Sequence, residues 1–237
     1  MCFGITGSDP FWYNNSMGDM AKKNRSIFIE PSIFAGDLGH LAEEAKRIED
    51  AGADGIHVDI MDGHFVPNLS LGAKALSAIR SSTNLFLDVH IMAYHPFNYI
   101  ESLVSSGAGG ITFHIEATES VEETLDYIRK CNIKSGLAFC PDTTISFIPK
   151  YLDKCDKILL MTVNPGFSGQ SFIHDMLSRI RDVRHMCDTL KIDTPPGIQV
   201  DGGIDATTAA LSIQAGANHL VSGSFLFEGG MMKEKIA

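Results

Sequence analysis

Eight short runs rich in β-branched and other apolar residues alternate along this chain with longer amphipathic stretches, and no other feature constrains the fold as strongly. In the first amphipathic stretch, Leu41, Ala45 and Ile48 recur at helical spacing while charged residues occupy the other face. Strands that alternate with helices indicate βαβ units and a parallel sheet. The eight expected strands are residues 27–29, 55–60, 85–90, 110–114, 134–138, 157–162, 197–201 and 219–222.

A weak internal repeat supports a count of eight units. Gly52, Gly107 and Gly216 each follow a helical stretch and precede a strand, where glycine suits the left-handed position after a helix. They stand 55 and 109 residues apart, close to two and four units of roughly 27 residues. We therefore expect one (β/α)8 TIM barrel of parallel strands over residues 26–237. A doubly wound open sheet is the alternative, but it would place a glycine-rich turn after the first strand, and residues 30–34 contain no glycine.

The sequence also predicts the character of the two ends of the chain. Residues 1–25 contain no apolar run long enough for a secretory signal, and we expect a loosely ordered extension there. Only residues 231–237 follow Gly230, so the eighth helix should be short and the contact that closes the barrel weaker than usual.

Composition narrows the possible partners. The net charge is −10, from 19 basic and 29 acidic side chains, which disfavours nucleic acid and anionic membrane surfaces but is compatible with a small anionic metabolite in a local positive pocket. No apolar run approaches the roughly 18 residues of a membrane span. The 5 cysteines are scattered and form no C-x-x-C pair, which is typical of a protein kept reduced in the cytoplasm. The number of subunits stays open, a homo-oligomer included.

The second expected strand is the most informative stretch. Alternate residues of a strand share a face, so His57, Asp59 and Met61 point one way and the apolar residues between them the other. In a barrel, this polar set faces the lumen near the carboxyl-terminal mouth, where active sites of the fold lie. The next strand repeats the phase with Asp88, His90 and Met92.

An aspartate and a histidine that point into an apolar barrel need a compensating partner. A divalent ion supplies one, and imidazole nitrogens with carboxylate oxygens suit Zn²⁺, Fe²⁺, Mn²⁺ or Co²⁺. A hydrogen-bonded structural cluster is the alternative, which two histidines and an aspartate in matching phase make less favoured. The sequence therefore predicts one divalent metal site between these two strands.

Asp201 ends the seventh expected strand, on the opposite side of the ring from Asp59. Two carboxylates on opposite faces of a carbon can invert a C–H centre, because one removes the proton and the other returns one to the far face. Glycine-bearing loops after the last three strands indicate a phosphate site, since barrels commonly hold phosphate there on backbone N–H groups. These loops contain Gly166, Phe167, Ser168, Gly169, Gly202, Gly203, Gly223 and Ser224.

Six motifs, in order, resemble the ribulose-phosphate 3-epimerase family of the pentose phosphate and Calvin pathways, over about residues 26–230. They are residues 31–33, 57–68, 87–92, 161–170, 200–204 and 223–224. The resemblance implies a barrel of the ribulose-phosphate binding type and an isomerase. It further implies that D-ribulose 5-phosphate and D-xylulose 5-phosphate interconvert at C3 through an enediolate, by metal-assisted proton transfer between two aspartates.

The resemblance also implies residue roles. Asp59 would accept the proton and Asp201 would donate one, while Ser32 and His90, with the phosphate loops, would contact the substrate. Three methionines would pack around the reacting carbons without offering them a proton, although core packing explains a methionine equally well. The implied metal ligands are His57, Asp59, His90 and Asp201, and the methionines are Met61, Met92 and Met161.

Two positions depart from the family pattern. Ser168 replaces a glycine of the phosphate loop, which backbone amides should tolerate. Cys140 replaces the asparagine before Pro141, which leaves the role of the end of the fifth strand unexplained.

Three other functions are weighed against this one. An epimerase for a six-carbon ketose phosphate such as D-allulose 6-phosphate shares the motifs, although residues 200–204 favour the pentose enzyme. Related decarboxylases and hexulose-phosphate synthases would carry Asp-x-Lys-x-x-Asp on the third strand, where this chain has Asp88-Val89-His90. A catalytically silent phosphate-binding scaffold would need neither both aspartates nor both histidines.

Overall fold

The eight expected strands form one parallel sheet that curls into a ring. The computed structural model describes residues 26–190, 192 and 194–237, so the extension expected over residues 1–25 lies outside the described residues. Strand boundaries differ from the expected ones by at most two residues. The strands are β1 (Phe28–Pro31), β2 (Gly55–Met61), β3 (Phe86–Met92), β4 (Gly110–His114), β5 (Lys134–Phe139), β6 (Lys157–Met161), β7 (Gly197–Asp201) and β8 (His219–Ser222).

Hydrogen-bonded neighbours follow the order β1-β8-β7-β6-β5-β4-β3-β2. The closing contact between β8 and β1, expected to be weak, is a full parallel ladder from Phe28 to Pro31, which corrects that expectation. The loosest junction lies instead between β1 and β2. There, one bridge between Ser32 and His57 joins the strands, and Ile29 and Asp54 exchange two hydrogen bonds, from Asp54 N to Ile29 O and from Ile29 N to Asp54 Oδ2.

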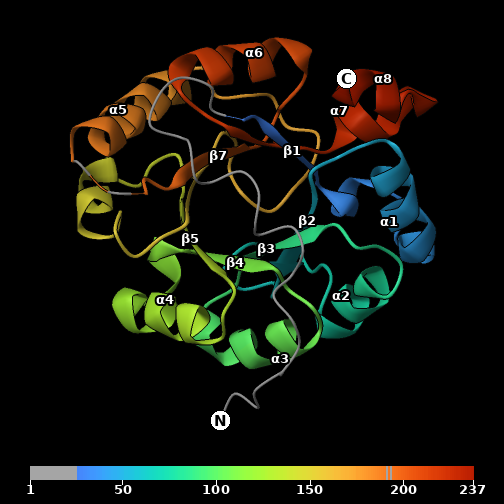
Figure 1. Ribbon diagram of the computed structural model, residues 1–237, viewed down its shortest axis with the longest axis horizontal. Helices are drawn as coiled ribbons and strands as arrows, with labels where there is room; N and C mark the ends of the chain where they lie inside the picture. Colours follow the sequence, from blue (N-terminus) through green and yellow to red (C-terminus); the bar gives the residue numbers. More distant parts are fainter. Residues whose placement is uncertain (1–25, 191, 193) are drawn as a thin grey trace.

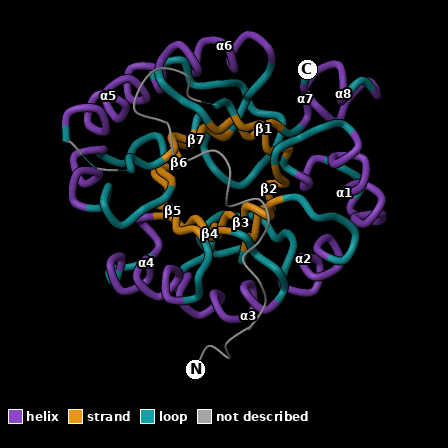
Figure 2. Tube along the Cα trace, viewed as in Figure 1, coloured by secondary structure: helices purple, strands orange, loops and turns teal. Residues whose placement is uncertain are grey.

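Helices surround this ring, as Figures 1 and 2 show, and the fold is the expected (β/α)8 barrel. A 3-10 helix, η6 (Ile145–Lys150), takes the place of an α-helix between β5 and β6, because Pro149 cannot donate an interior hydrogen bond. The last helices are short, as expected. The α-helices are α1 (Leu41–Asp50), α2 (Ala73–Arg80), α3 (Ile100–Ser105), α4 (Val121–Lys130), α5 (Met176–Thr189), α6 (Ala206–Ala215), α7 (Ser224–Phe227) and α8 (Met232–Ile236).

The hydrophobic core lies between the ring and the helices. On β2, the outward residues Ile56, Val58 and Ile60 are buried against the helix layer, where Ala45 and Ile48 of α1 belong to the same cluster. Each large aliphatic side chain buried in this way contributes about 1.5–3 kcal/mol. The inner faces of the strands are therefore free to carry polar groups. Among the helices of the described residues, none has both the length and the apolar character needed to cross a bilayer.

Helix α6 shows how local signals fix an element that leads to the site. Asp205 Oδ1 accepts hydrogen bonds from the backbone N–H groups of Thr207 and Thr208, both at 2.8 Å, and so begins the helix. Gly216 ends it in the left-handed conformation, with φ of 117°. A Cβ atom at this position would lie 2.7 Å from Cβ and Cγ of Arg184.

Gly216→Ala is therefore expected to destabilise the protein by about 2 kcal/mol, since the left-handed backbone alone costs an L-residue about 1–2 kcal/mol. The melting temperature should fall by roughly 4–8 °C in thermal unfolding followed by circular dichroism. Gly72→Ala is the matched control, because Gly72 has extended backbone (φ −141°) and a Cβ atom added there would meet nothing within 4 Å. Equal melting temperatures for the two variants would contradict the expectation.

Candidate active site

Alternate residues of β2 and β3 point into the lumen with the expected phase. His57 and Asp59 of β2 lie beside Asp88 and His90 of β3, respectively, in the strand register. His57 Nδ1 is 2.9 Å from Asp88 Oδ2, and His90 Nδ1 is 3.2 Å from Asp59 Oδ1. All four side chains are buried. The inner face of the barrel thus carries a polar cluster next to the mouth.

Asp201, at the end of β7, joins this cluster. Its Oδ2 lies 3.8 Å from His57 Nε2 and 3.8 Å from His90 Nδ1. Asp59 Oδ1 lies 3.3 Å from the same His57 nitrogen. One ligand atom from each of His57, Asp59, His90 and Asp201 lies within 4.8 Å of the others. The structure therefore brings the four predicted ligand side chains to a common point.

The two aspartates come from different sides of the ring, on strands that are three steps apart where four would be diametrically opposite. Only β1 and β8 separate β2 from β7 on the shorter path around the barrel. The carboxylates approach the cluster from different strands and meet at its centre. A substrate between them has to enter from the mouth, because both histidines beneath are completely buried.

The donor atoms fit a divalent cation. Asp88 Oδ2 accepts a hydrogen bond from Gln199 at 2.7 Å, Asp88 Oδ1 pairs with Lys157 at 2.9 Å, and His57 Nδ1 faces the same carboxylate. The opposite ring nitrogen, His57 Nε2, is buried without a hydrogen-bond partner in the described part of the chain. The site therefore offers two imidazole nitrogens and two carboxylate oxygens, a set of donor atoms that suits a transition-metal ion.

The electrostatics of this point also favour positive charge. Burial disfavours the charged form of His57, yet the neighbouring carboxylates of Asp59 and Asp88 raise the pKa of His57 well above its usual value. Burial likewise acts to raise the pKa of Asp59, but the two histidines outweigh it and lower that pKa. At Asp201, burial and then the charge of Asp59 raise the pKa to about 7. The two carboxylates therefore have pKa values that are pushed apart, with Asp59 the stronger acid and Asp201 the weaker, a pattern that acid–base catalysis uses.

Ser32 completes the surroundings of Asp59. It follows β1 directly, and its Oγ donates a 2.7 Å hydrogen bond to Asp59 Oδ2. Since the other oxygen of Asp59 faces the histidines, both carboxylate oxygens are oriented. Ser32 is buried and lies at the junction of β1 and β2.

A cavity of about 660 Å³ opens above the cluster at the mouth of the barrel. Asp59 and Asp201 line it, whereas His57 and His90 are completely buried and stand behind it, so His90 is not exposed to the cavity as a substrate contact would be. The other predicted site residues that line the cavity are Ser32, Met61, Met92, Met161, Gly166, Phe167, Ser168, Gly169, Gly202, Gly203, Gly223 and Ser224.

Two glycines hold the loops of the cavity close together. Gly202 has φ of 117°, and a Cβ atom there would lie 2.3 Å from Cγ2 of Val163. Gly203 has φ of 65°, and its Cβ atom would lie 2.5 Å from the backbone N of Phe172. The loop after β7 therefore packs closely on the loop after β6, with Gly202 against the side chain of Val163 and Gly203 against the backbone of Phe172.

Sequence reasoning missed the charged layer beneath the cluster and the side chains beside it. The buried Lys157 lies 3.4 Å from Glu30 Oε1 as well as beside Asp88. On the other side, His114 of β4 contacts His90. The alternation that predicted the inner face of β2 could have found part of this layer. Glu30 stands two residues before Ser32, and Gln199 stands two before Asp201, so each shares the inward face of its strand.

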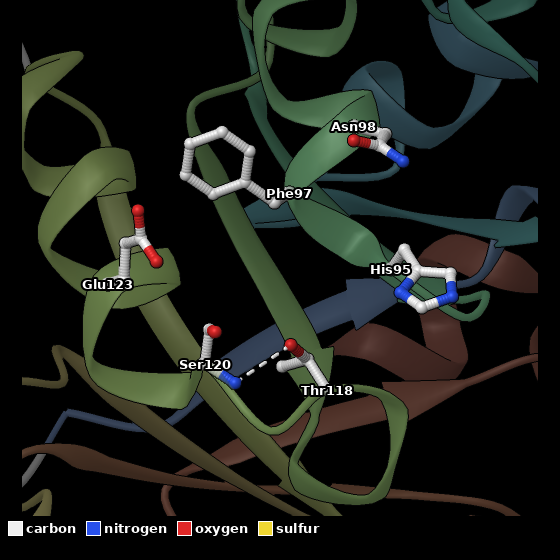
Figure 3. Close-up of a pocket in the computed structure, with 6 residues that line it drawn as sticks. All are labelled: His95, Phe97, Asn98, Thr118, Ser120 and Glu123. Carbon is white, nitrogen blue, oxygen red and sulfur yellow. Dashed lines mark hydrogen bonds between the residues drawn. The ribbon is translucent and has the colours of Figure 1, made fainter.

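A smaller hollow of about 230 Å³ lies on the outer rim, near η4 (Pro96–Tyr99) and the start of α4. Figure 3 shows its two titratable side chains, His95 and Glu123, on opposite sides of the opening. The backbone N–H of Ser120 donates to Thr118 Oγ1 across its floor, at 3.1 Å. Since no charged groups converge there, this hollow offers less chemistry than the barrel mouth.

Comparison with known proteins gives one consistent family. Residues 28–227 match the model of the "Ribulose-phosphate 3 epimerase family". A ribulose-phosphate 3-epimerase of Chlamydia pneumoniae is 51% identical over 91% of this chain and 95% of its own length, and one of Synechocystis sp. is 43% identical over 90% and 93%. A solved mutant tryptophan synthase alpha-subunit of Pyrococcus furiosus shares the fold, with a TM-score of 0.65 at 16% identity over 90% of this chain and 97% of its own.

Proposed function

Because the chain belongs to the ribulose-phosphate 3 epimerase family, we propose that it interconverts D-ribulose 5-phosphate and D-xylulose 5-phosphate by proton transfer at C3 between Asp59 and Asp201. The observation that carries the proposal is the meeting of two carboxylates, one from β2 and one from β7, on the wall of a cavity ringed by glycine loops. The enzyme is an isomerase of the epimerase class. We further propose that residues 26–237 are its single catalytic domain.

Asp59 removes the C3 proton of D-ribulose 5-phosphate. It is ionised, and the hydrogen bond from Ser32 fixes one of its oxygens while the other faces the centre of the cluster. A carboxylate held in this way needs no reorganisation when the substrate arrives. Loss of the proton gives an enediolate.

Asp201 returns a proton to the opposite face of C3. Its side chain is 17% exposed and lines the cavity, and its pKa of about 7 keeps much of it protonated near neutral pH. A proton donor of this acidity matches the operating pH, which is where acid catalysis is most efficient. In the reverse reaction the two residues exchange roles.

We propose that one divalent ion, Zn²⁺, Fe²⁺, Mn²⁺ or Co²⁺, is held by His57, Asp59, His90 and Asp201, whose donor atoms lie within 4.8 Å of one another. When bound, such an ion polarises the C2 carbonyl and offsets the negative charge of the enediolate. His57 Nε2 lies between the two carboxylates without a hydrogen-bond partner in the described residues, so this nitrogen is available to the ion.

The rest of the cavity positions the sugar phosphate. The backbone of the loops at Gly166–Gly169, Gly202–Gly203 and Gly223–Ser224 would hold the phosphate group, and Ser168 fits because the main chain makes these contacts. Met61 and Met92 pack with Val66, and Met161 packs with Leu159 on the neighbouring wall. Thioethers there cover the reacting carbons without offering a proton.

Purified protein assayed on both candidate sugar phosphates tests the proposal. We expect turnover of D-ribulose 5-phosphate with kcat/KM at least about tenfold above that of D-allulose 6-phosphate, since a pocket shaped for one sugar discriminates by roughly this much per added carbon group. Nuclear magnetic resonance identifies the product. Higher kcat/KM for the six-carbon substrate would favour the related hexose-phosphate epimerase, and no turnover of either would favour a silent scaffold.

We also propose that the enzyme acts in the cytoplasm, in a pathway that consumes or supplies pentose phosphates. Cys140 and Cys155 carry free thiols, as a reducing compartment requires.

A further inference from the structure

A second group of side chains continues the site away from the cavity, on the far side of His90. His114, the last residue of β4, has no exposed surface, and its Nε2 lies 2.9 Å from His90 Nε2. Its Nδ1 lies 3.2 Å from Glu116 Oε2. Neither His114 nor Glu116 lines the cavity, so neither can act on a substrate directly.

Glu116 is held in one orientation. Its Oε1 accepts hydrogen bonds from the backbone N–H of Cys140, at 2.8 Å, and from Thr143 Oγ1. Burial acts to raise the pKa of Glu116, but its contacts with His114, Thr143 and the Cys140 N–H outweigh burial and lower the pKa to about 2. The second oxygen of an ionised carboxylate therefore always faces His114.

The backbone contact accounts for Cys140. Sequence comparison left this departure from asparagine without a role, yet the main-chain N–H at this position, not the side chain, anchors Glu116. The Cys140 thiol lies 3.4 Å from His114 Nδ1 and also hydrogen-bonds Glu116. This anchoring N–H is present whichever side chain stands at position 140.

Two proton arrangements of the two rings are possible, and only the first offers the Glu116 carboxylate a donor. Because His90 Nε2 and His114 Nε2 lie 2.9 Å apart, one of these nitrogens donates a proton and the other accepts it. In the first arrangement, His114 Nδ1–H donates to Glu116 and His90 Nε2–H donates to His114. In the second, both protons move by one nitrogen, and His90 Nδ1–H points at Asp59. A nitrogen that carries a proton cannot bind a metal ion.

We propose that Glu116 and His114 are positioning residues for His90: they accept the chain of hydrogen bonds that keeps the His90 proton on Nε2 and leaves Nδ1 bare for the divalent ion. This proposal rests on the proposed metal site and adds two residues to it. The two histidine ligands then differ in how they are oriented. Asp88 contacts His57 directly, whereas Glu116 acts on His90 through the ring of His114.

Glu116→Gln reverses the chain without changing its shape. The N–H of Cys140 and the hydroxyl of Thr143 require the amide oxygen on their side, so the amide NH₂ must face His114. His114 Nδ1 then has to accept, and His90 Nδ1 becomes protonated. We expect the dissociation constant for Co²⁺, titrated into metal-free protein and followed by its visible absorption, to rise roughly 10–100-fold.

The imidazole ¹⁵N shifts give a readout that does not depend on activity. In the Zn²⁺-loaded wild-type protein, His90 should be protonated on Nε2 and His114 on Nδ1, and Glu116→Gln should reverse both in the metal-free protein. Glu123→Gln is the matched control, since Glu123 is an exposed carboxylate at the rim hollow of Figure 3. The control should change neither the Co²⁺ affinity nor the ¹⁵N shifts.

A second variant distinguishes loss of the hydrogen-bond chain from misfolding. His114→Phe keeps a ring against Phe65, whose centroid is 4.7 Å away, but offers no acceptor to His90. It should weaken Co²⁺ binding by a similar factor, and the double variant should be no weaker than the more affected single variant, since the two residues act as one unit.

Unchanged Co²⁺ affinity in Glu116→Gln, or weaker affinity with unchanged protonation of His90, would overturn the proposal. Should the wild-type chain bind no divalent ion at all, the proposed metal site would fail. Even then, the ¹⁵N shifts of the metal-free protein would show whether Glu116 decides which nitrogen of His90 carries the proton.

Discussion

Asp201→Asn is expected to slow net epimerisation by about 10³-fold in both directions, while D-ribulose 5-phosphate still exchanges its C3 hydrogen with solvent. Asparagine has the size of aspartate but no proton to donate, and general acid–base catalysis by one positioned side chain is worth about 10²–10⁴-fold. Asp59 remains ionised and oriented by Ser32, so it continues to remove and return the same proton. In heavy water, unreacted substrate should therefore gain deuterium at C3 without inversion.

The reciprocal variant makes this test sharper. Asp59→Asn should show the opposite asymmetry, with exchange retained only on D-xylulose 5-phosphate, whose C3 proton faces Asp201. Asp182→Asn, an exposed change on α5, should leave both rates unchanged. Elemental analysis of each variant shows whether the metal is retained. Near-normal turnover of Asp201→Asn in both directions would mean that another group serves the second face of C3.

Removal of the divalent ion is expected to lower kcat by at least about 100-fold, because several kcal/mol of transition-state charge stabilisation would be lost. Without a cation, no metal polarises the C2 carbonyl, and the ionised carboxylate of Asp59 repels the negative charge that develops on the enediolate. Dialysis against a chelator, followed by assay and elemental analysis, measures the loss. Zn²⁺, Fe²⁺, Mn²⁺ or Co²⁺ added back should restore activity.

Circular dichroism before and after dialysis is the control for this experiment, since an unfolded sample would be inactive for a trivial reason. The holoprotein should also melt at a higher temperature than the metal-free protein, by mass action. Full activity in a sample shown to be metal-free would identify the four side chains as a hydrogen-bonded structural cluster, the alternative that the sequence pattern makes less favoured.

Local patterns predicted the barrel and its inner face well. Period-two alternation placed His57 and Asp59 inward, and glycine after helices marked the ends of repeat units, as the left-handed Gly52, Gly107 and Gly216 confirm. Such signals are local, because they depend on the geometry of one strand or one helix end. They therefore needed no knowledge of which strands are neighbours.

Pairwise partners could not be predicted in this way. Lys157 and Glu30 meet although they are 127 residues apart, and the distance of β7 from β2 depends on how eight strands close. The hydrogen bond between His90 and His114 depends on the register of β3 against β4. These contacts arise only once the ring has formed, so the pattern of any single segment does not contain them.

The junction between β1 and β2 limits how this barrel can adapt to a new substrate. The bridge that joins the two strands at the mouth is made by Ser32 and His57, whose side chains also orient Asp59 and face the centre of the site. We expect a substitution at either position to disturb the orientation of Asp59 or the centre of the site next to the one bridge that joins these strands. The loops after β6, β7 and β8 follow strands with continuous ladders, so they can be altered for a different sugar without loosening the barrel.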